Sequence, residues 1–416
     1  MGRTPHPTWI AITACWLSLW LLAGCGLGTP ASISANRAQQ SQTLRLKARS
    51  GHAIVKLRAG SSDQAVKSLS RFVEGAIPSL GISVLNVGTA GAASQLAALT
   101  TAGAVEYSEP DYIAATLVKT NDPGLARQWG HDAIHLYQAW DVTMGDPNVV
   151  VAVVDTGVDL EHPDLRDRLV PGISFVAGTS APRDDNGHGT HVAGIIAAAA
   201  NNGVGGAGVA PKCRIMPVKV LNDKGEGNTS DIVAGIVYAA DHGARVINLS
   251  LGGTGGGKAL EAAIAYAQRK GCVVVAAMGN DGNNSEDYPA SYPGVIAVGA
   301  TDQDDQLANF SNYGRWVSVV APGADIYSTM PTYHVTLDDV DPGADRSYGL
   351  LSGTSMATPY VAGLAALMVT VNPRLTPGSV KTALQNSADK VGGALGFNIQ
   401  TGYGRIDAPQ ALRAVM

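Results

Sequence analysis

The sequence predicts an α/β domain, a three-layer arrangement of a parallel sheet with helices on both faces, preceded by a small α+β domain. From Val149 onward, strands that are apolar throughout alternate with amphipathic helices, which is typical of parallel sheets buried on both faces. Hydrophobic residues form 45% of the 416 residues, enough for a sizeable core. At about 150 residues per domain, the chain is long enough for two or three folded units.

Composition excludes several classes of protein. Only 15% of the residues are charged, and 29 basic against 34 acidic residues give a net charge of −5. A nucleic-acid surface needs dense Lys and Arg, so no nucleic-acid partner is expected. Glycine is abundant, at 50 residues, but follows no three-residue period, which excludes a collagen-like chain.

The amino-terminal residues resemble a bacterial export signal. Residues 9–22 form an apolar run shorter than the roughly 18 residues that a membrane-spanning helix needs. The sequence LAGC at 22–25 resembles a lipobox, in which the cysteine receives a diacylglycerol and cleavage falls just before it. The alternative is an ordinary secretory signal. We favour lipidation, with residues 1–24 as signal peptide and Cys25 as an anchor that tethers the chain without spanning the membrane.

Two segments precede the sheet-forming region. Residues 25–50 are small and polar, which suits a flexible spacer. A compact unit is expected over 51–117, with strands at 52–57 and 105–112 and a helical stretch from Ser62. A unit of this size folds but is only marginally stable alone.

The following region contains the elements of the parallel sheet and its helices. Strands are expected at 149–154, 214–220, 246–250 and 273–277, and helices from His188, over 231–242 after the cap candidate Ser230, over 258–270 and over 354–371. Such sheets bind ligands at the carboxyl ends of their strands, so the chemistry is expected there.

Cys213 and Cys272 each begin a predicted apolar strand. A buried free cysteine behaves as a small hydrophobic residue, so we predict two free thiols rather than a disulfide. Neither cysteine belongs to a CxxC pair, and no thiolate metal site is expected.

Three motifs place reactive side chains at the ends of these elements. Asp155 closes the apolar strand, and a carboxylate there is costly unless it has a fixed hydrogen-bond partner. His188, in NGHGTHVAG, lies in the first turn of a helix, whose positive end disfavours the imidazolium and leaves the ring available as a base. Ser355, in LSGTSMATP, begins another helix. Each has an ordinary structural explanation, but together they supply an orienting carboxylate, a base and a nucleophile.

These motifs, in the order Asp, His, Ser, resemble those of the subtilisin-like serine proteases, and of thermitase-like members in particular. The resemblance extends over residues 121 to about 411 and includes SLGG at 250–253 and GYGRID at 402–407. It implies a subtilisin-like fold and an endopeptidase that hydrolyses polypeptides through an acyl-enzyme.

The resemblance assigns roles motif by motif. Ser355 would be the nucleophile, His188 the general base and acid, and Asp155 the group that orients the histidine. Asn280, in AMGN, matches the oxyanion-hole asparagine, assisted by the backbone N–H of Ser355.

Substrate-binding residues are implied by the same resemblance. They comprise an edge segment that pairs with extended substrate and the lining of the primary specificity pocket: Ser250, Leu251, Gly252, Gly253, Ala277, Met278, Gly279 and Asp287. If Asp287 points into that pocket, a basic P1 side chain would pair with it. The alternative is a solvated acid on a surface loop.

The resemblance further implies maturation. Residues 51–117 resemble the family's inhibitory propeptide, with the cut near Leu117–Val118 or at Lys119–Thr120. Residues 118–416 would form the peptidase domain, expected to be a monomer. Because Cys25 lies upstream of the cut, maturation would release this domain from an extracytoplasmic precursor anchored at the cell envelope.

A structural Ca²⁺ ion is also implied by resemblance. Its ligands would be the side chains of Asp122, Asp164 and Asn202 and the loop carbonyls of Ala200, Val204 and Gly206. The alternative is a turn with solvated acids.

Three other functions compete with the protease interpretation. GGTGGGK at 252–258 resembles a phosphate loop, but Ala259 follows where a Mg²⁺-binding hydroxyl is required. GTSMA at 353–357 departs from the GxSxG of esterases at its last position. An inactive substrate-binding relative is disfavoured because no member of the catalytic set is substituted.

The aspartate-rich residues 331–350 are either a solvated hairpin extension or a weak cation site, and the sequence does not choose between them.

Overall fold

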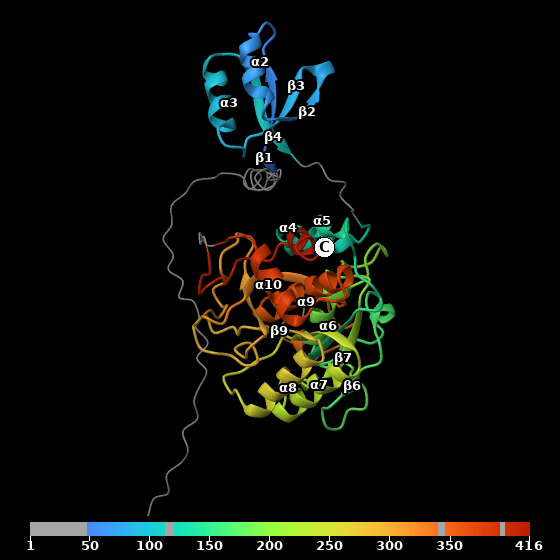
Figure 1. The fold of residues 1–416 in the computed structure, drawn as a ribbon. Coiled ribbons are helices and arrows are strands. Elements are labelled where there is room, and N and C mark those ends of the chain that lie inside the picture. Colours follow the sequence, from blue (N-terminus) through green and yellow to red (C-terminus); the bar gives the residue numbers. More distant parts are fainter. Residues whose placement is uncertain (1–47, 113–119, 340–345, 392–395) are drawn as a thin grey trace, which may run out of the picture. The chain divides into compact units, whose positions relative to one another are not determined.

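The computed structural model describes residues 48–112, 120–339, 346–391 and 396–416. The chain divides into two compact units, residues 1–114 and 115–416, which are described separately (Figure 1). The predicted signal peptide, Cys25, most of the predicted spacer and the predicted cleavage region at 117–119 lie outside the described residues.

The first unit contains a four-stranded antiparallel sheet in the order β2-β3-β1-β4. Its elements are β1 (Ala48–Leu57), α2 (Asp63–Ser70), β2 (Val73–Ile77), the 3₁₀ helix η1 (Pro78–Leu80), β3 (Ile82–Asn86), α3 (Ala92–Thr101) and β4 (Val105–Tyr112). Buried side chains such as Val55, Leu69 and Leu85 join helices and sheet in one core. β1 begins at Ala48, so the strand starts within the residues predicted as spacer.

The second unit is built on a seven-stranded sheet in the order β11-β10-β9-β8-β5-β7-β6, whose paired strands are parallel. The strands are β5 (Val150–Asp155), β6 (Ile173–Ser174), β7 (Arg214–Lys219), β8 (Ala244–Leu249), β9 (Val273–Ala277), β10 (Ile296–Thr301) and β11 (Val319–Pro322). A separate antiparallel pair, β12 (Ile326–Thr329) and β13 (Tyr348–Leu351), flanks the aspartate-rich segment.

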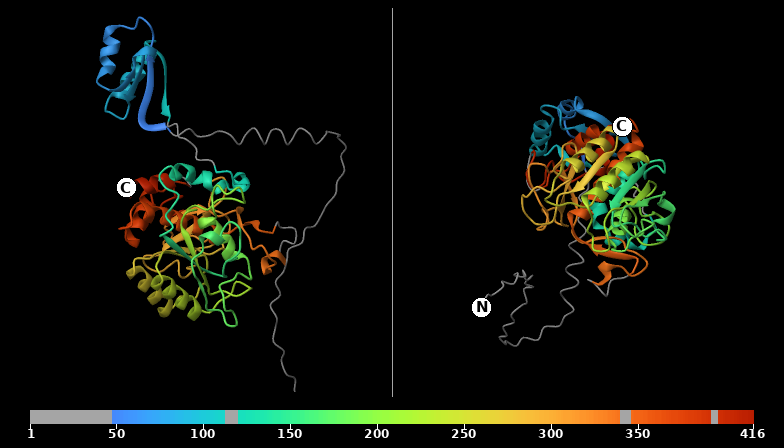
Figure 2. Two further views of the ribbon diagram at one scale, coloured as in Figure 1. Left: turned by 90° about the vertical axis from the view of Figure 1, so that its right-hand side faces the viewer. Right: turned by 90° about the horizontal axis from the view of Figure 1, so that it is seen from below.

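Helices cover both faces of this sheet (Figures 1 and 2). One face carries α4 (Trp129–Ala133), α5 (Leu136–Trp140), α6 (His188–Ala197), α9 (Thr354–Val371), α10 (Pro377–Ser387) and α11 (Ala408–Arg413), and the other carries α7 (Thr229–Asp241) and α8 (Lys258–Arg269). Along β5, Val151 and Val153 enter the core under α9, whereas Ala152 and Val154 enter the core under α7 and α8. The predicted three-layer α/β fold is therefore confirmed.

Three further 3₁₀ helices lie in the connections of the second unit: η2 (Pro123–Arg127), η3 (Arg166–Arg168) and η4 (Thr336–Asp339). The last of these belongs to the aspartate-rich segment.

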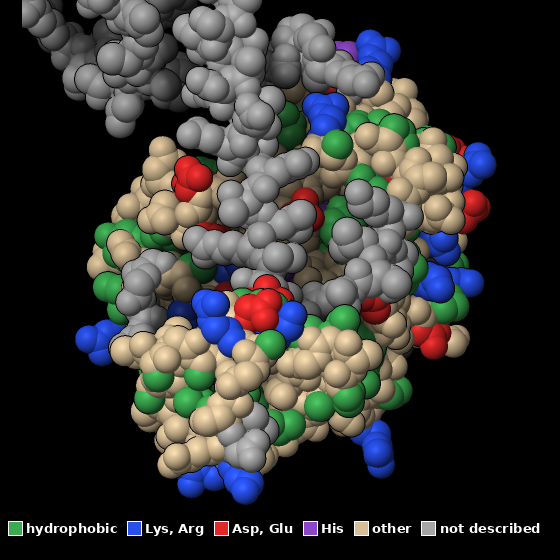
Figure 3. Space-filling view, turned by 90° about the horizontal axis from the view of Figure 1, so that it is seen from above, with side chains coloured by type: hydrophobic (Ala, Val, Ile, Leu, Met, Phe, Trp, Pro, Cys, Tyr) green, Lys and Arg blue, Asp and Glu red, His purple; other side chains and the backbone are tan. Residues whose placement is uncertain are grey.

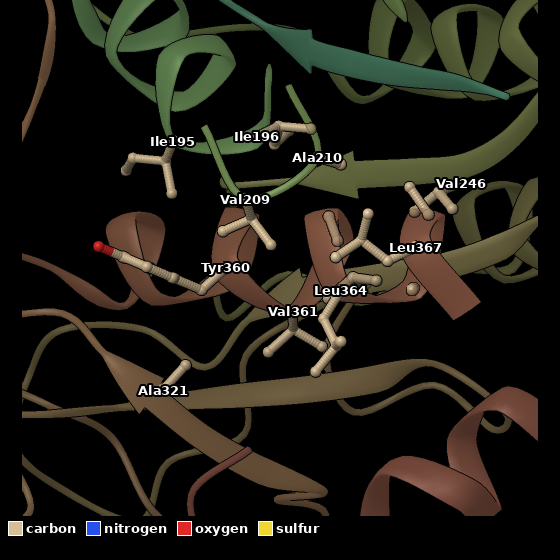
Figure 4. Close-up of a cluster of buried hydrophobic side chains, with 14 of the residues drawn as sticks. Ile195, Ile196, Val209, Ala210, Val246, Ala321, Tyr360, Val361, Leu364 and Leu367 are labelled. Atoms are coloured by element: carbon tan, nitrogen blue, oxygen red, sulfur yellow. The ribbon is translucent and has the colours of Figure 1, made fainter. Parts of the chain in front are cut away.

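The longest helix, α9, runs through the core of one layer. Its side chains Tyr360, Val361 and Leu364 lie between Ile195 of α6 and Ala321 of β11 (Figure 4). Of the described helices, α9 alone is long and apolar enough to cross a membrane, but 83% of it is buried inside the domain. A fully buried leucine contributes about 1.5–3 kcal/mol, so this packing fixes the amino end of α9, where the predicted nucleophile lies.

Most predicted elements are confirmed to within two residues, and α7 shows where the sequence prediction was wrong. The helix begins at Thr229, and the cap position is occupied by Asn228 rather than Ser230. Asn228 has the extended backbone of a cap residue and donates to the Asp231 carboxylate in the first turn. Both residue types are common caps, so composition alone did not separate them.

Cys213 and Cys272 are free and buried, as predicted. Burial raises the pKa of both thiols to about 11, so they stay protonated at neutral pH. The two cysteines act as small core residues.

Charged side chains occur singly or in small groups on the face drawn in Figure 3, among larger uncharged areas. This distribution agrees with the 15% share of charged residues in the chain. Exposed ion pairs such as Lys258–Glu261, at 2.9 Å, contribute little to stability. The second unit is held chiefly by the two apolar cores on either side of its sheet.

Candidate active site

The candidate active site lies at the carboxyl end of β5, the strand at which the order of strands in the sheet changes direction. β5 pairs with β7 on one side and with β8 on the other, so the connections that follow them diverge at the carboxyl end of β5. Such divergence opens a crevice at this edge of the sheet. Asp155 ends β5, Ser250 follows β8, His188 begins α6 and Ser355 is the second residue of α9.

Asp155 and His188 are joined by a short hydrogen bond. His188 Nδ1 lies 2.7 Å from Asp155 Oδ1, which also accepts from the backbone N–H of Thr156 at 2.7 Å. Asp155 is fully buried, and its other oxygen, Oδ2, is without a hydrogen-bond partner among the described residues. Because a carboxylate only accepts, Nδ1 carries the proton and Nε2 is left as the basic nitrogen of the neutral ring.

The pKa of His188 reflects opposing influences. Burial lowers it, whereas the negative charge of Asp155, their hydrogen bond and the charge of Asp184 together raise it above its ordinary value. The carboxylates therefore stabilise the imidazolium form of this histidine. A base with this property can hold a proton taken from a neighbouring hydroxyl.

A buried carboxylate that the sequence analysis missed holds the loop before His188. Asp184 accepts from Thr156 Oγ1 at 2.8 Å, from Gly187 N at 2.9 Å and from Thr190 Oγ1 at 2.6 Å. It thereby ties the start of α6 to the end of β5. The motif DDNG contained the signal, since acids directly before a helix commonly accept from its first N–H groups.

A fully buried lysine, also missed, supports the same region. Lys219 Nζ donates to the carbonyls of Thr156 and Leu221, at 2.6 and 2.9 Å, and to Asp185 Oδ1 at 2.6 Å. A lysine that follows the apolar residues IMPV of this strand is unusual and was a readable signal, because a buried ammonium requires fixed acceptors.

Ser355 is tied to the end of β8. Its Oγ donates to the carbonyl of Ser250 at 3.2 Å, and Ser250 Oγ donates to the carbonyl of Ser355 at 2.7 Å. The described hydrogen bonds include none between Ser355 and His188. Catalytic hydrogen bonds of unliganded sites are often long and tighten when substrate binds.

Asn280 faces the same point. Its Oδ1 accepts from the N–H and Oγ1 of Thr354, at 2.8 and 2.9 Å, which turns Nδ2 the other way. A carbon built on Gly353 would lie 3.6 Å from both Asn280 Nδ2 and the backbone nitrogen of Ser355. The same carbon would lie 3.7 Å from Asn280 Oδ1, so the amide group as a whole lies close to the backbone nitrogen of Ser355.

The predicted substrate segments lie beside each other. Gly253 and Tyr288 exchange backbone hydrogen bonds of 3.1 and 2.9 Å, which brings the 250–253 segment to the loop that contains Asp287. A carbon added to Gly279 would lie 1.9 Å from Asp287 Oδ2, and one added to Gly252 would lie 3.9 Å from Asp287 Cγ. The structure thus brings Asp287 against both glycine segments. The remaining members of the predicted set are Leu251, which is half-buried, and Ser250, Ala277 and Met278, which are buried.

Asp287 itself is 6% exposed. Burial, reinforced by the negative charge of Asp281, raises its pKa above the ordinary value. No hydrogen bond or ion pair to its carboxylate is found within the described ranges. A buried acid without a basic partner is costly unless a ligand supplies one.

The predicted calcium ligands also converge. Asp122 and Asp164 are buried, at 4% and 1% exposure, and Asn202 Nδ2 donates to Asp164 Oδ1 at 2.6 Å. Asp122 accepts from the N–H groups of the loop that carries Ala200, Asn202, Val204 and Gly206. No basic side chain of the described residues forms an ion pair with either acid. Two buried carboxylates that contact the same loop fit a hard divalent cation such as Ca²⁺.

A parallel-sheet domain with an aspartate–histidine pair at the end of one strand and a serine at a helix start beside the next strand has the arrangement of a serine hydrolase. Residues 146–404 match the model of the Subtilase family. The chain belongs to the subtilase family and is a serine endopeptidase.

Several known proteases are similar to this chain. A thermophilic serine proteinase of Bacillus sp. (strain AK1) is 47% identical over 309 residues, which cover 74% of this chain and 73% of that protein. Thermitase of Thermoactinomyces vulgaris is 46% identical over 294 residues, 70% of this chain and 99% of thermitase. Among solved structures, fervidolysin of Fervidobacterium pennivorans, described as a keratinolytic enzyme related to subtilisin, matches with a TM-score of 0.62 and 32% identity, covering 88% of this chain and 61% of its own.

Proposed function

We propose that this chain is an exported serine endopeptidase made as a self-cleaving precursor, in which Ser355 is the nucleophile and His188 the base. The observation that carries the proposal is the 2.7 Å hydrogen bond between His188 Nδ1 and Asp155 Oδ1 at the end of β5. This bond orients the ring and leaves Nε2 to accept a proton.

The reaction then proceeds in two halves. Ser355 Oγ attacks the carbonyl carbon of the scissile peptide bond while His188 Nε2 takes the hydroxyl proton. Asn280 Nδ2 and the N–H of Ser355 donate to the oxyanion that develops. His188 passes its proton to the leaving amine, which leaves an ester on Ser355. Water, deprotonated by His188, hydrolyses the ester and restores the serine.

Polypeptide substrates would bind as an added strand along Ser250–Gly253. Backbone groups of an edge segment give affinity without regard to sequence, and adjacent pockets give specificity. Gly252 and Gly253 have no Cβ, so the substrate backbone can approach closely. Specificity would then be set by the side chain at P1.

We assign a preference for basic P1 residues to Asp287. Its buried carboxylate, near Gly252 and Gly279, lacks a cationic partner among the described residues. A lysine or arginine side chain would supply that partner in a charge-assisted hydrogen bond. Apolar P1 residues would instead leave the acid unpaired.

The precursor would carry three temporary parts: a signal peptide at residues 1–24, a lipid on Cys25 and a propeptide at 51–117. The separate compact fold of the first unit supports the propeptide assignment. Because the anchor precedes the propeptide in the chain, cleavage near residues 117–120 would release residues 118–416 as a monomeric, extracytoplasmic enzyme.

Calcium would act as a structural ion in this enzyme. The side chains of Asp122, Asp164 and Asn202 and loop carbonyls, including those of Ala200, Val204 and Gly206, would hold it. The ion would neutralise the two buried carboxylates and thereby stabilise the loop.

The central proposal is tested with casein as substrate. Wild-type protein is expected to cleave casein, and Ser355→Ala to reduce the rate to near background, because the acyl-enzyme cannot form. Equal folding of the two proteins, checked by circular dichroism, is the control. Equal casein cleavage by both would overturn the assignment of Ser355.

A further inference from the structure

A segment of the aspartate-rich region contacts the loop that precedes the catalytic histidine. Tyr333 OH donates to the carbonyl of Asp184 at 2.8 Å. The N–H groups of Thr336 and Leu337 donate to the next two carbonyls, those of Asp185 and Asn186, at 3.3 and 3.0 Å. Three consecutive carbonyls directly before Gly187 and His188 thus accept from one segment, residues 330–339, here called the brace.

Side-chain packing reinforces these bonds. The guanidinium of Arg183 lies 3.8 Å from the centre of the Tyr333 ring. Gly187 has φ +112, and a carbon added to it would lie 3.1 Å from Met330 and 3.2 Å from Val335. Val335 is 2% exposed. Met330 and Val335 of the brace are therefore packed against the backbone of the loop before His188.

The brace also has its own supports. Thr332 donates to Asp159 Oδ2 through its N–H and its hydroxyl, at 2.9 and 2.8 Å. Asp338 Oδ2 accepts from the N–H of Val335 at 3.0 Å and closes the turn. The brace therefore has hydrogen bonds beyond those to the carbonyls of residues 184–186.

The loop before His188 is consequently held from two sides. On one side the Asp184 carboxylate accepts from Thr156 and Thr190, and Lys219 donates to Asp185. On the other side the brace donates to the carbonyls. A catalytic group loses rate steeply when its position loosens, so contacts on both sides of its loop affect the reaction directly.

We propose that the brace is a positioning element for His188, with Tyr333 as its principal residue. The proposal rests on the function proposed above, because it gives His188 the role of base. Tyr333 does not touch the reacting atoms and acts through the backbone of Asp184.

The test is Tyr333→Phe, which removes one hydroxyl and keeps the ring over Arg183. Tyr266→Phe is the matched control, because Tyr266 OH also makes one hydrogen bond, 2.7 Å to Asp241, on the exposed surface of α8. Both variants are measured as the full chain for kcat and KM on a peptide substrate, with active sites titrated by a sulfonyl fluoride.

For Tyr333→Phe we expect kcat per active site to fall roughly threefold to tenfold, with KM within about twofold. The acid limb of the kcat profile should move to lower pH, because a less well-placed His188 pairs less with Asp155. The other charged or titratable groups facing His188 are Asp184 and His191, and neither is altered. Tyr266→Phe should match wild type in both measurements.

A kcat and acid limb equal to those of Tyr266→Phe would overturn the proposal. To separate this from failure of the proposed function, amide exchange at residues 184–188 is compared between Ser355→Ala and Ser355→Ala/Tyr333→Phe. Faster exchange in the double variant supports the brace even if the chain cleaves nothing. Unchanged exchange would contradict it.

Discussion

At the scale of single residues, the proposed role of Asp287 in substrate specificity can be tested most directly. It is a buried carboxylate placed between two glycine segments, and its pKa is raised by burial and by Asp281. In such a position the ionised form gains from any cation that enters. We therefore expect the identity of residue 287 to affect which P1 side chain is preferred.

Asp287→Asn should reverse the preference at P1. We expect kcat/KM for Lys-P1 peptides to fall about 10- to 100-fold, since a hydrogen bond to a charged group contributes about 1.5–3 kcal/mol. Phe-P1 peptides should change little. Glu286→Gln removes the exposed neighbouring charge and serves as the control. The Lys-to-Phe ratio of wild type should also decline as the pH falls, because Asp287 becomes protonated while both substrates share the same triad. Equal hydrolysis of both peptides by wild type would contradict the assignment.

The residues of the site were predictable to different degrees. Asp155, His188 and Ser355 were predictable because each lies in a long motif at the end of an element. Tyr333 was not, because its partner Asp184 is 149 positions away in the chain. Hydrogen bonds to backbone carbonyls leave no pattern in the sequence, since any residue supplies a carbonyl.

At the scale of elements, Asp164 connects the predicted calcium ligands to β13, the strand before the nucleophile. Asp164 Oδ2 accepts from Tyr348 OH at 2.9 Å, and Tyr348 begins β13, which runs toward Ser355. Burial raises the pKa of Asp164 to about 6, an effect opposed by its bonds to Asn202 and Tyr348 and increased by the charge of Asp122. A divalent cation would relieve this unfavourable burial of charge.

Removal of calcium should lower thermal stability. In the Ser355→Ala background, which prevents autolysis, we expect EDTA to lower Tm by several degrees, since a ligand at 100 times its Kd adds about 2.7 kcal/mol. Asp164→Asn should lose most of this calcium effect, whereas Asp223→Asn, an exposed acid, should retain it. A calcium-dependent gain in Tm that is the same in Asp164→Asn and wild type would exclude this site.

Elements were predictable where their period was clear. Helix α9 was predicted at its observed bounds, Thr354–Val371, because its apolar run is long and Ser and Gly precede it. β10 and β11 were not predicted. Both are short apolar runs next to glycine or proline, and such runs do not distinguish strand from loop without their neighbours in the sheet.

At the scale of the whole molecule, the chain combines a small antiparallel unit with a large parallel-sheet domain. The proposed anchor and propeptide both precede the peptidase domain in the chain. A cut after the propeptide would therefore separate the peptidase domain from the anchor. A proposed cleavage region separates the anchor and the propeptide from the peptidase domain. Cleavage there would give two fragments whose masses can be measured.

The precursor should cut itself. Expressed without the signal peptide, as residues 26–416, wild type is expected to lose a fragment ending between Leu117 and Thr120, while Ser355→Ala stays whole. Intact-mass spectrometry of both proteins gives the result directly. If both stay whole despite proper folding, the catalytic set is idle or another protease performs the maturation.

The two buried cysteines have one more consequence. Within the proposed mature domain, Cys213 and Cys272 are the only thiols of the sequence, and both are concealed in the core with a pKa near 11. An alkylating reagent reacts with thiolates, so it reaches them only when the domain opens. Alkylation of these two cysteines therefore requires opening of the domain. In the Ser355→Ala protein, the rate at which the alkylated form accumulates would report how often the domain opens.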